Sequence, residues 1–294
     1  MILRRLLAGL AQSALSAPAR VESLPGTNKL VRGRHGLFIA NPNDLYIGRS
    51  LIHYGEFSEL EWRLLGRLCA PGDIVAEIGA NIGAHTVALA RTVGVHGEVL
   101  AVEPQPEIYR TLCANAMLNG LANVTALACG CGERTETLRI PDYDHGYAAN
   151  FGSISLRGHA EATATVPIEV KRLDDLLRPR TRLGLLKIDV EGMEAEVIRG
   201  ATEAIGSFRP VLYVENDRAE KSPELVELIG KLGYRMWWHM PPLFNPENFF
   251  GERSNVLGPA VSFNMLCVHG SRSAGAAGGL AEVTDSSRHP RLAP

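Results

Sequence analysis

Paired cysteines are the first feature that this sequence of 294 residues lacks. An odd number of cysteines does not suit a framework of disulfides, and their spacing contains no C-x-x-C pair of the kind that holds a metal. We therefore expect reduced thiols and a cytoplasmic protein. The five cysteines are Cys69, Cys113, Cys129, Cys131 and Cys267.

An excess of charge of one sign is also missing. The chain has 30 Lys and Arg residues against 32 Asp and Glu residues, which gives a formal net charge of −2. Non-specific binding to nucleic acid depends on a basic surface. We therefore expect no nucleic-acid partner and expect a small-molecule or glycan partner instead.

Long hydrophobic runs are absent too, since no stretch approaches the roughly 18 apolar residues of a membrane-spanning helix. We expect no stable membrane span. The opening stretch MILRRLLAGLAQSALSAPAR has the outline of a signal peptide, because Arg4 and Arg5 precede a short apolar run. Gln12, Ser13 and Ser16 dilute that run. This favours a peripheral amphipathic helix, with peripheral membrane association, over export.

From residue 73 onward the sequence alternates short β-branched runs with amphipathic stretches. This alternation is typical of βα units around a parallel sheet and predicts a Rossmann-like α/β fold with helices on both faces. The predicted strands cover residues 73–79, 98–104, 123–129, 183–190, 209–216, 234–240 and 262–270. The predicted helices cover residues 55–69, 84–93, 106–120, 192–205 and 222–233.

Three segments depart from this rhythm. Residues 1–70 predict a helical and irregular N-terminal cover over the main domain, which covers residues 71–270. Within that domain, three short β-like runs at 135–140, 151–156 and 165–173 predict an inserted β meander over 133–172. Residues 271–294 are rich in Gly, Ala, Ser and Pro and lack an apolar period, so they predict a disordered tail.

The first strand ends in AEIGANIGAH, where a dinucleotide-binding protein would have G-x-G-x-x-G. Counted from Gly79, the second and third glycines are replaced by Asn81 and Ala84. Glu77 would repel a pyrophosphate but could pair with the ammonium of an amino-acid-like ligand. Glu103, at the end of the second strand, could accept both ribose hydroxyls of an adenosine. These residues favour S-adenosylmethionine over NAD, although Glu103 suits both.

Four stretches carry a resemblance to a known family. EIGANIGAHTVALA, AVEPQPEIYRTLCANAMLNG, LLKIDVEGMEAEVIRGA and RPVLYVEN resemble the successive motifs of the FkbM-type methyltransferases, a branch of the class I S-adenosylmethionine-dependent enzymes. The resemblance runs over roughly residues 45–270. It implies a seven-stranded, mostly parallel sheet with an antiparallel last strand. It also implies methyl transfer, usually to an oxygen of a sugar or of a polyketide-type natural product.

Carried over position by position, the resemblance implies the following cofactor contacts. Glu77, Gly79 and Asn81 would hold the methionine part of S-adenosylmethionine, and Glu103 would hold the ribose. Cys129 and Gly130 would flank the adenine. The sequence departs from the common pattern in having Glu77 where such strands often carry Asp, and in the run CGCGE at the adenine turn.

An acidic cluster follows the fourth predicted strand. Asp189 comes at the strand end with Lys187 two residues before it, and the next strand ends in Glu215 and Asn216. Asp189, Lys187 and Glu215 are the catalytic candidates. In one version Asp189, Glu215 and Asn216 bind Mg²⁺ or another divalent cation, similarly to the catechol-type O-methyltransferases. In the other version, without a metal, Asp189 acts as a base or orients the acceptor. A third interpretation is that Asp189 only orders the turn.

The neighbouring acids have a simpler interpretation. We predict that Glu191 and Glu194 lie in the first turn of the next helix, where their negative charge stabilises the helix start. Further candidates for the acceptor site are His53, His145 and His239, together with the aromatic stretch MWWHMPPLFNPENFF, which could form a lid or a core strand with an ordinary loop. Two other classes of protein stay open: an NAD-linked oxidoreductase or epimerase, and a non-catalytic cofactor-binding module.

Overall fold

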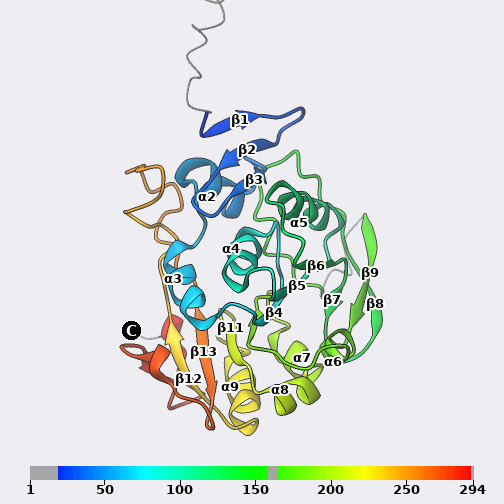
Figure 1. Cartoon of the computed structure of the whole chain (residues 1–294), viewed down its shortest axis with the longest axis vertical. Helices are drawn as coiled ribbons and strands as arrows, with labels where there is room; N and C mark the ends of the chain where they lie inside the picture. Colours follow the sequence, from blue (N-terminus) through cyan, green and yellow to red (C-terminus); the bar gives the residue numbers. More distant parts are fainter. Residues whose placement is uncertain (1–18, 158–163, 293–294) are drawn as a thin grey trace, which may run out of the picture.

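The computed structural model describes residues 19–157 and 164–292. The amphipathic helix predicted within the first twenty residues lies almost wholly outside this range. The described N-terminal part begins with an antiparallel three-stranded sheet, formed by β1 (Val21–Ser23), β2 (Lys29–Arg32) and β3 (Leu37–Ala40). Two helices follow, α2 (Ile47–Tyr54) and α3 (Glu59–Leu68). Figure 1 shows the three strands at one end of the molecule, with α3 running down beside the main sheet.

The main sheet has eight strands in the order β14-β12-β13-β11-β10-β4-β5-β6. Strands β6, β5, β4, β10 and β11 are parallel, and β13 is antiparallel to both of its neighbours. The seven strands predicted from residue 73 onward are therefore confirmed in place and direction. Their bounds are β4 (Ile74–Ile78), β5 (Glu98–Val102), β6 (Val124–Leu127), β10 (Leu185–Ile188), β11 (Val211–Glu215), β12 (Tyr234–His239) and β13 (Asn264–His269).

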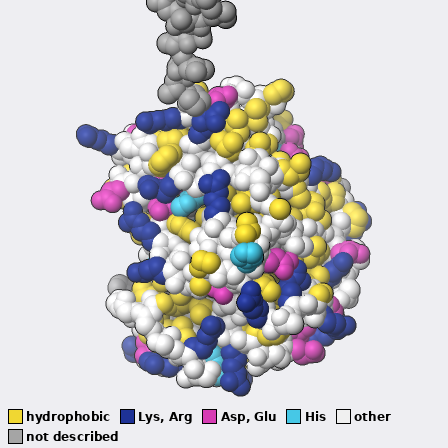
Figure 2. Space-filling view, viewed as in Figure 1, with side chains coloured by type: hydrophobic (Ala, Val, Ile, Leu, Met, Phe, Trp, Pro, Cys, Tyr) yellow, Lys and Arg dark blue, Asp and Glu magenta, His cyan; other side chains and the backbone are white. Residues whose placement is uncertain are grey.

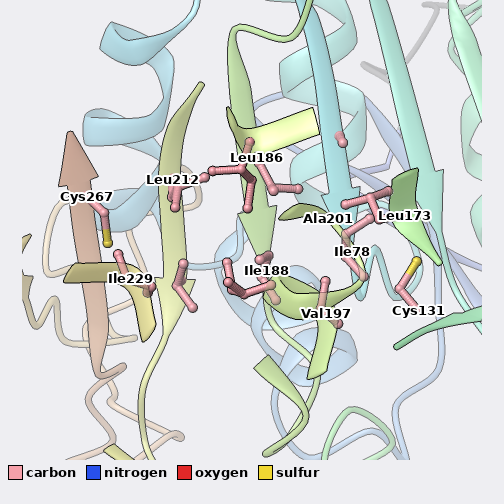
Figure 3. Packing of buried hydrophobic residues seen from close by; sticks show 14 of the residues in the cluster. Ile78, Cys131, Leu173, Leu186, Ile188, Val197, Ala201, Leu212, Ile229 and Cys267 are labelled. Atoms are coloured by element: carbon pink, nitrogen blue, oxygen red, sulfur yellow. The ribbon is translucent and has the colours of Figure 1, made fainter. Parts of the chain in front are cut away.

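Helices cover both faces of this sheet because the central strands are apolar on both sides. Val75 and Leu185 pack with helix α3 on one face, and Leu186 and Ile188 pack with α7 and α9 on the other. Figure 3 shows the second face, where Leu186 and Ile188 from the sheet lie with Val197 and other buried side chains. The helices are α4 (Ala84–Val93), α5 (Pro106–Leu118), α6 (Leu173–Leu177), α7 (Glu194–Arg199), α8 (Thr202–Phe208) and α9 (Ser222–Lys231).

The helix predicted over residues 192–205 is two helices, α7 and α8. The interruption falls at Gly200, where a Cβ atom would lie 2.0 Å from the backbone oxygen of Gly132. The backbone of Gly132 therefore passes directly against this point, and only glycine fits there. At the interruption the N–H of Asp174 donates to the backbone oxygen of Gly200, and the Asp174 carboxylate accepts hydrogen bonds from the N–H groups of Glu203 and Ala204 at the start of α8. These contacts come from a distant segment, which the local pattern did not predict.

The insertion forms a small separate sheet in the order β7-β9-β8. Its strands are β7 (Gly130–Cys131), β8 (Glu136–Pro141) and β9 (Thr165–Lys171). Two of the three predicted β-like runs are therefore strands. The run at 151–156 is a turn followed by irregular chain that lines the cavity described below.

Two predictions, the seven-stranded sheet and the disordered tail, are wrong for the same reason: the tail contributes a strand to the sheet. An eighth strand, β14 (Ala281–Glu282), pairs with β12 at the sheet edge. It lies between two short 3-10 helices, η1 (Gly275–Ala277) and η2 (Pro290–Leu292). His289 is buried and its Nε2 lies 2.7 Å from the backbone oxygen of Asn216. The tail is held by backbone pairing and by single side chains, which leave no apolar period in the sequence.

Within residues 19–157 and 164–292, no helix is long and apolar enough to cross a membrane. Figure 2 shows Lys and Arg side chains scattered among acidic and apolar ones on one face of the molecule, without a large field of one sign. The cytoplasmic location, the absence of a nucleic-acid partner and the domain boundaries remain predictions.

Candidate functional site

A cavity of about 600 Å³ opens at the carboxyl ends of the parallel strands. In open α/β sheets this edge is where ligands bind. The cavity is lined by nine of the ten residues that the sequence predicted for the site: Glu77, Gly79, Asn81, Glu103, Cys129, Gly130, Lys187, Asp189 and Glu215. Asn216 is the exception.

The turn after β4 brings the backbone close to the end of β10. Gly79 has a φ of 83°, and a Cβ atom there would lie 1.8 Å from the backbone oxygen of Asp189. Only glycine fits this approach. Asn81 also has a positive φ, 49°, and its Oδ1 accepts a hydrogen bond from the backbone N–H of Ile82 at 2.8 Å. The turn therefore presents its backbone to the cavity.

Glu103 ends β5 with both carboxylate oxygens held by the backbone. Oε2 accepts a hydrogen bond from the N–H of Asn81 at 3.0 Å, and Oε1 accepts one from the N–H of Gln105 at 2.9 Å. Burial nevertheless raises the pKa of Glu103 to about 7. Each oxygen keeps a further lone pair, so the fixed carboxylate can accept two more hydrogen bonds from a ligand with neighbouring hydroxyls.

Lys187 is buried at the centre of the site. In the sheet it stands opposite Glu77 of β4 and Tyr213 of β11, and its Nζ lies 2.8 Å from Oδ2 of Asp189. Burial lowers the pKa of Lys187, but the charges of Asp189, Glu61 and Glu77 more than offset this effect and the pKa is raised. Burial likewise raises the pKa of Asp189, and the Lys187 ammonium outweighs it, so Asp189 is ionised with a lowered pKa.

Glu215 lines the cavity beside Asp189. Its Oε2 is buried without a hydrogen-bond partner, and burial together with the negative charge of Asp189 raises its pKa well above the usual range. A hydrogen bond from Glu215 helps to lower the pKa of Asp189. The two groups therefore act as a carboxyl next to a carboxylate.

The prediction that Asn216 is a metal ligand is wrong. Its Nδ2 donates a hydrogen bond to Oγ of Ser222 at 2.9 Å and lies 3.4 Å from Sδ of Met265, so the side chain is buried away from the cavity. Asn216 directly follows Glu215, and consecutive side chains of an extended chain point to opposite faces of the sheet. Among the residues that the structure describes, no group of three or more His, Cys, Asp or Glu side chains is arranged to hold a metal ion.

The two acids after Asp189 separate in the structure. Glu194 is the first residue of α7, and its Oε1 accepts hydrogen bonds from the backbone N–H groups of Gly192 and Val190. The prediction of a helix start is correct for Glu194. It is wrong for Glu191, which has a φ of 55°, lines the cavity and accepts a hydrogen bond from Arg218 at 2.6 Å.

Sequence reasoning missed two residues that the N-terminal part of the chain and α4 bring to the cavity. Glu61 comes from α3 and His85 from the first turn of α4. Glu61 was part of a correctly predicted helix, but nothing in its local pattern separates it from an exposed helix acid. Only the packing of α3 beside the sheet buries it.

The other candidate groups lie mostly outside the cavity wall. His53 and His239 do not line it, and His239 lies 2.8 Å from the hydroxyl of Tyr213 through its Nδ1. His145 packs against Phe151. Of the stretch MWWHMPPLFNPENFF only Leu243 lines the cavity, while Trp237 and Trp238 are core residues of β12. The interpretation of Trp237 and Trp238 as part of a core strand is correct, and the role of the loop that follows remains a prediction.

The sheet order, the antiparallel β13 and the ligand-facing strand ends are those of a Rossmann-like class I methyltransferase fold. The family model described as "Methyltransferase FkbM domain" matches residues 77–236, more than half of the chain. The chain belongs to this family. The NAD-linked alternative is not favoured.

Similar proteins carry methyltransferase names. The chain is 32% identical over 158 residues to "Methyltransferase sdnD" of Sordaria araneosa, covering 44% of this chain and 60% of that protein. It is 28% identical over 202 residues to "31-O-demethyl-FK506 methyltransferase FkbM" of Streptomyces tacrolimicus, covering 59% and 77%. A third relative, "Methyltransferase 1" of Beauveria bassiana, is 31% identical. The chain spans 60% and 57% of the length of the two fungal relatives.

Among solved structures, the chain is similar to a methyltransferase FkbM from Methylobacillus flagellatus KT. The identity is 17%, the coverage is 77% of this chain and 48% of that chain, and the TM-score is 0.45. It is also similar to Aeropyrum pernix fibrillarin with natively bound S-adenosyl-L-methionine. Here the identity is 14%, the coverage 85% and 98%, and the TM-score 0.42.

Proposed function

We propose that this protein is an S-adenosylmethionine-dependent O-methyltransferase that acts on a hydroxyl of a saccharide or natural product. The observation that carries the proposal is the charge of the cavity at the turn after β4. There the carboxylates of Glu61, Glu77 and Asp189 surround the single ammonium of Lys187. This surplus of negative charge suits a cationic sulfonium cofactor and disfavours a pyrophosphate.

The cofactor site is proposed residue by residue. Glu103 accepts the two ribose hydroxyls, for which its carboxylate is already fixed by two backbone N–H groups. Cys129 and Gly130 lie further along the same edge, at the end of β6, where they flank the adenine. Gly79 and Asn81, with Glu77 beneath them, surround the methionine part. When bound, S-adenosylmethionine supplies a methyl group on a positively charged sulfur.

Asp189 is the proposed group that handles the acceptor. Its side chain is 37% exposed, while Lys187 behind it is only 3% exposed. The carboxylate accepts the hydrogen bond of the acceptor hydroxyl and aligns its oxygen for in-line displacement. As the new oxygen–carbon bond forms and the carbon–sulfur bond breaks, the hydroxyl proton passes to Asp189. Lys187 keeps this carboxylate ionised, and Glu215 lies beside it as a protonated neighbour.

The acceptor end of the cavity is formed by the loop between β12 and β13. Leu243, Val261 and Phe263 line it together with Asp217 and Arg218. A wall that combines apolar and charged side chains suits an acceptor with both ring surface and hydroxyls. The name of the Streptomyces tacrolimicus relative, which refers to an O-demethyl compound, supports oxygen as the methylated atom.

Calorimetry against S-adenosylmethionine, S-adenosylhomocysteine and NAD tests the cofactor. We expect both adenosyl compounds to bind and NAD not to bind, and binding of NAD alone would overturn the proposal. Release of S-adenosylhomocysteine can then be measured with a panel of hydroxyl-bearing glycans and polyketides. An active acceptor allows the product to be examined by NMR for a new methoxy group; a methylated nitrogen or carbon would refute O-methylation.

Asp189→Asn tests the role of the acid with the same acceptor. We expect turnover to fall roughly 100-fold or more, because the amide cannot take up the proton. The affinity for S-adenosylhomocysteine should change little. Unchanged turnover would show that Asp189 only orders the turn.

A further inference from the structure

Four buried polar atoms of residues that line the cavity have no hydrogen-bond partner: Oε2 of Glu215, Nδ2 of Asn264, Oε1 of Glu61 and Nε2 of His85. The last two belong to side chains that lie next to each other. Glu61 is 4% exposed and His85 is 6% exposed, and both line the cavity. A buried polar atom without a partner costs free energy, so such atoms at a ligand cavity indicate where a ligand completes the hydrogen bonding.

The surrounding structure holds both side chains in position. Ser58 precedes α3 with a φ of 44°, and its Oγ donates a hydrogen bond to Oε2 of Glu61 at 3.0 Å. This leaves Oε1 free. His85 lies beside the backbone of Ser58, whose effect raises the pKa of the imidazole, and its Nε2 has no hydrogen-bond partner. Oε1 of Glu61 and Nδ1 of His85 are 3.9 Å apart, too far for a hydrogen bond.

Both free atoms are acceptors. Burial, together with the charge of Lys187, lowers the pKa of His85 to about 3, so the imidazole is neutral. A neutral imidazole has one ring nitrogen with a lone pair, and in the tautomer with the proton on Nδ1 this nitrogen is Nε2. The ligand group that lies between them must therefore supply at least two hydrogens. A hydroxyl supplies one, whereas a primary ammonium supplies three.

The charges around the pair also call for a cation. Glu61 faces Lys187 and Asp189 of β10, and Glu77 of β4 and Tyr213 of β11 lie in the same region. Oε2 of Glu77 already accepts a hydrogen bond from Oγ1 of Thr86 at 2.6 Å. Lys187 can neutralise one of the three carboxylates, and burial raises the pKa of Glu61 and of Glu77 to about 7, so neither is fully ionised near neutral pH without a further cation. A second positive charge would therefore stabilise the site.

We propose that Glu61 and His85 bind the α-ammonium group of the cofactor's amino-acid end. This inference rests on the proposed use of S-adenosylmethionine and changes one part of it, because Glu77 then contributes charge from below while Glu61 and His85 make the direct contacts. The direction of the bound cofactor follows from the strand order. With adenine at the end of β6 and ribose at Glu103 of β5, the amino-acid end extends toward β4 and β10, next to the first turn of α4.

A consequence is that the cofactor site extends beyond the family-matched segment, which begins at residue 77. Helix α3 of the N-terminal part supplies one of the two contacts. Glu61 and His85 are positioning residues for the cofactor, since neither takes part in the methyl transfer.

The test is calorimetry of the full chain with two ligands that differ only in the ammonium group. These are S-adenosylhomocysteine and its deaminated analogue, which keeps the adenosyl group and the carboxylate. The unaltered protein should prefer S-adenosylhomocysteine by roughly 10- to 100-fold, as expected for hydrogen bonds to a charged group. Glu61→Gln and His85→Asn should remove most of this preference while leaving the affinity for the deaminated analogue within about threefold. His85→Gln, which can return an acceptor atom to the position of Nε2, should restore part of it.

Glu59→Gln is the matched control. Glu59 lies on the same helix and is 7% exposed, but its carboxylate is 2.7 Å from Nε2 of His35 and does not line the cavity. We expect this variant to keep the full preference. The inference is overturned if Glu61→Gln and His85→Asn keep the preference, or if both ligands weaken equally. If the unaltered protein binds no adenosyl compound at all, the proposed function itself fails.

Discussion

Nζ of Lys187 in β10 lies 2.8 Å from Oδ2 of Asp189, which directly follows the last residue of that strand at the cavity end. The pair joins the interior of the sheet to the proposed reaction site. Lys187 is surrounded by the carboxylates of Glu61 and Glu77 in addition to Asp189. Its charge is therefore needed both for the stability of the fold and for the ionisation of Asp189.

Lys187→Met should destabilise the protein. Removing one partner of a buried ion pair leaves the other charge unpaired, and we expect the free energy of unfolding to fall by about 3 kcal/mol. Urea denaturation measures this change. The control is Lys231→Met. The Lys231 side chain is 76% exposed, and its Nζ lies 4.0 Å from Oε2 of Glu227. It should shift stability by less than about 0.5 kcal/mol. Equal stability of the two variants would contradict a central role for Lys187.

Glu103→Gln should weaken the binding of S-adenosylhomocysteine. The amide offers one acceptor oxygen where the carboxylate offers two, and its NH₂ group would face the backbone N–H of Asn81 or Gln105. We expect the Kd to rise roughly 10- to 100-fold in calorimetry. Glu98→Gln, at the opposite end of β5, removes a carboxylate that pairs with Arg180 away from the cavity. If it weakened binding as much as Glu103→Gln, the assignment of the ribose site would be wrong.

Gly79→Ala should be more harmful than the same change at Gly94. Both glycines have a positive φ, but a Cβ at Gly94 meets nothing within 4 Å, whereas at Gly79 it meets the backbone oxygen of Asp189. Gly94→Ala should cost only the conformational strain, about 1 kcal/mol. Gly79→Ala should cost at least about 2 kcal/mol more, because the clash must be relieved by moving the chain. Thermal denaturation of both variants compares these costs, and a similar loss at the two positions would contradict the close approach.

The stability of the ligand-free protein should fall as the pH rises from about 4.5 to 7. Burial raises the pKa of Glu61, Glu77 and Glu103 to about 7 in the folded protein, whereas glutamate in an unfolded chain titrates near 4.3. In this window the folded state binds more protons than the unfolded state, so deprotonation favours unfolding. Above about pH 7 this contribution is constant.

Bound S-adenosylhomocysteine should reduce that loss, because its ammonium and ribose hydroxyls donate to the ionised carboxylates. Its affinity should therefore increase between pH 6 and 8. Melting temperatures at pH 5, 6, 7 and 8, with and without saturating ligand, measure both effects. A ligand-induced shift that is independent of pH would argue against ionised glutamates in the complex.

Chelation should leave turnover unchanged once an acceptor is known. The predicted ligand set needs Asn216, and its side chain is engaged with Ser222 and Met265. Assays in EDTA, with and without added Mg²⁺, test this expectation. Loss of activity in EDTA that Mg²⁺ restores would show that Asp189 and Glu215 recruit a cation with other ligands.

The elements predicted best are those whose signal is local. Strands β4, β5 and β10 are largely apolar runs that are followed directly by Gly79, Glu103 and Asp189. These three residues could be placed at one edge because parallel strands end together. Predictions failed where a distant segment decides. The break between α7 and α8 involves Asp174, whose carboxylate accepts hydrogen bonds from backbone N–H groups at the start of α8.

The tail shows the same limit. Residues 281–282 become a strand because β12 offers a free edge, not because of their own composition. Asn216 follows Glu215 directly, but alternation along the strand path turns its side chain into the core.

The sequence by itself determined the α/β fold, the succession of its strands along the chain and the residues that follow them. It could do so because a buried parallel strand and its βα turn are formed by consecutive residues. Only the tertiary structure decided that Glu61 and His85 meet at the cavity and that Glu191 belongs to its wall. These placements follow from how α3 packs against α4 and from the close turn after β10. Such long-range packing produces no periodic pattern in the sequence, so it could not be predicted from local residues.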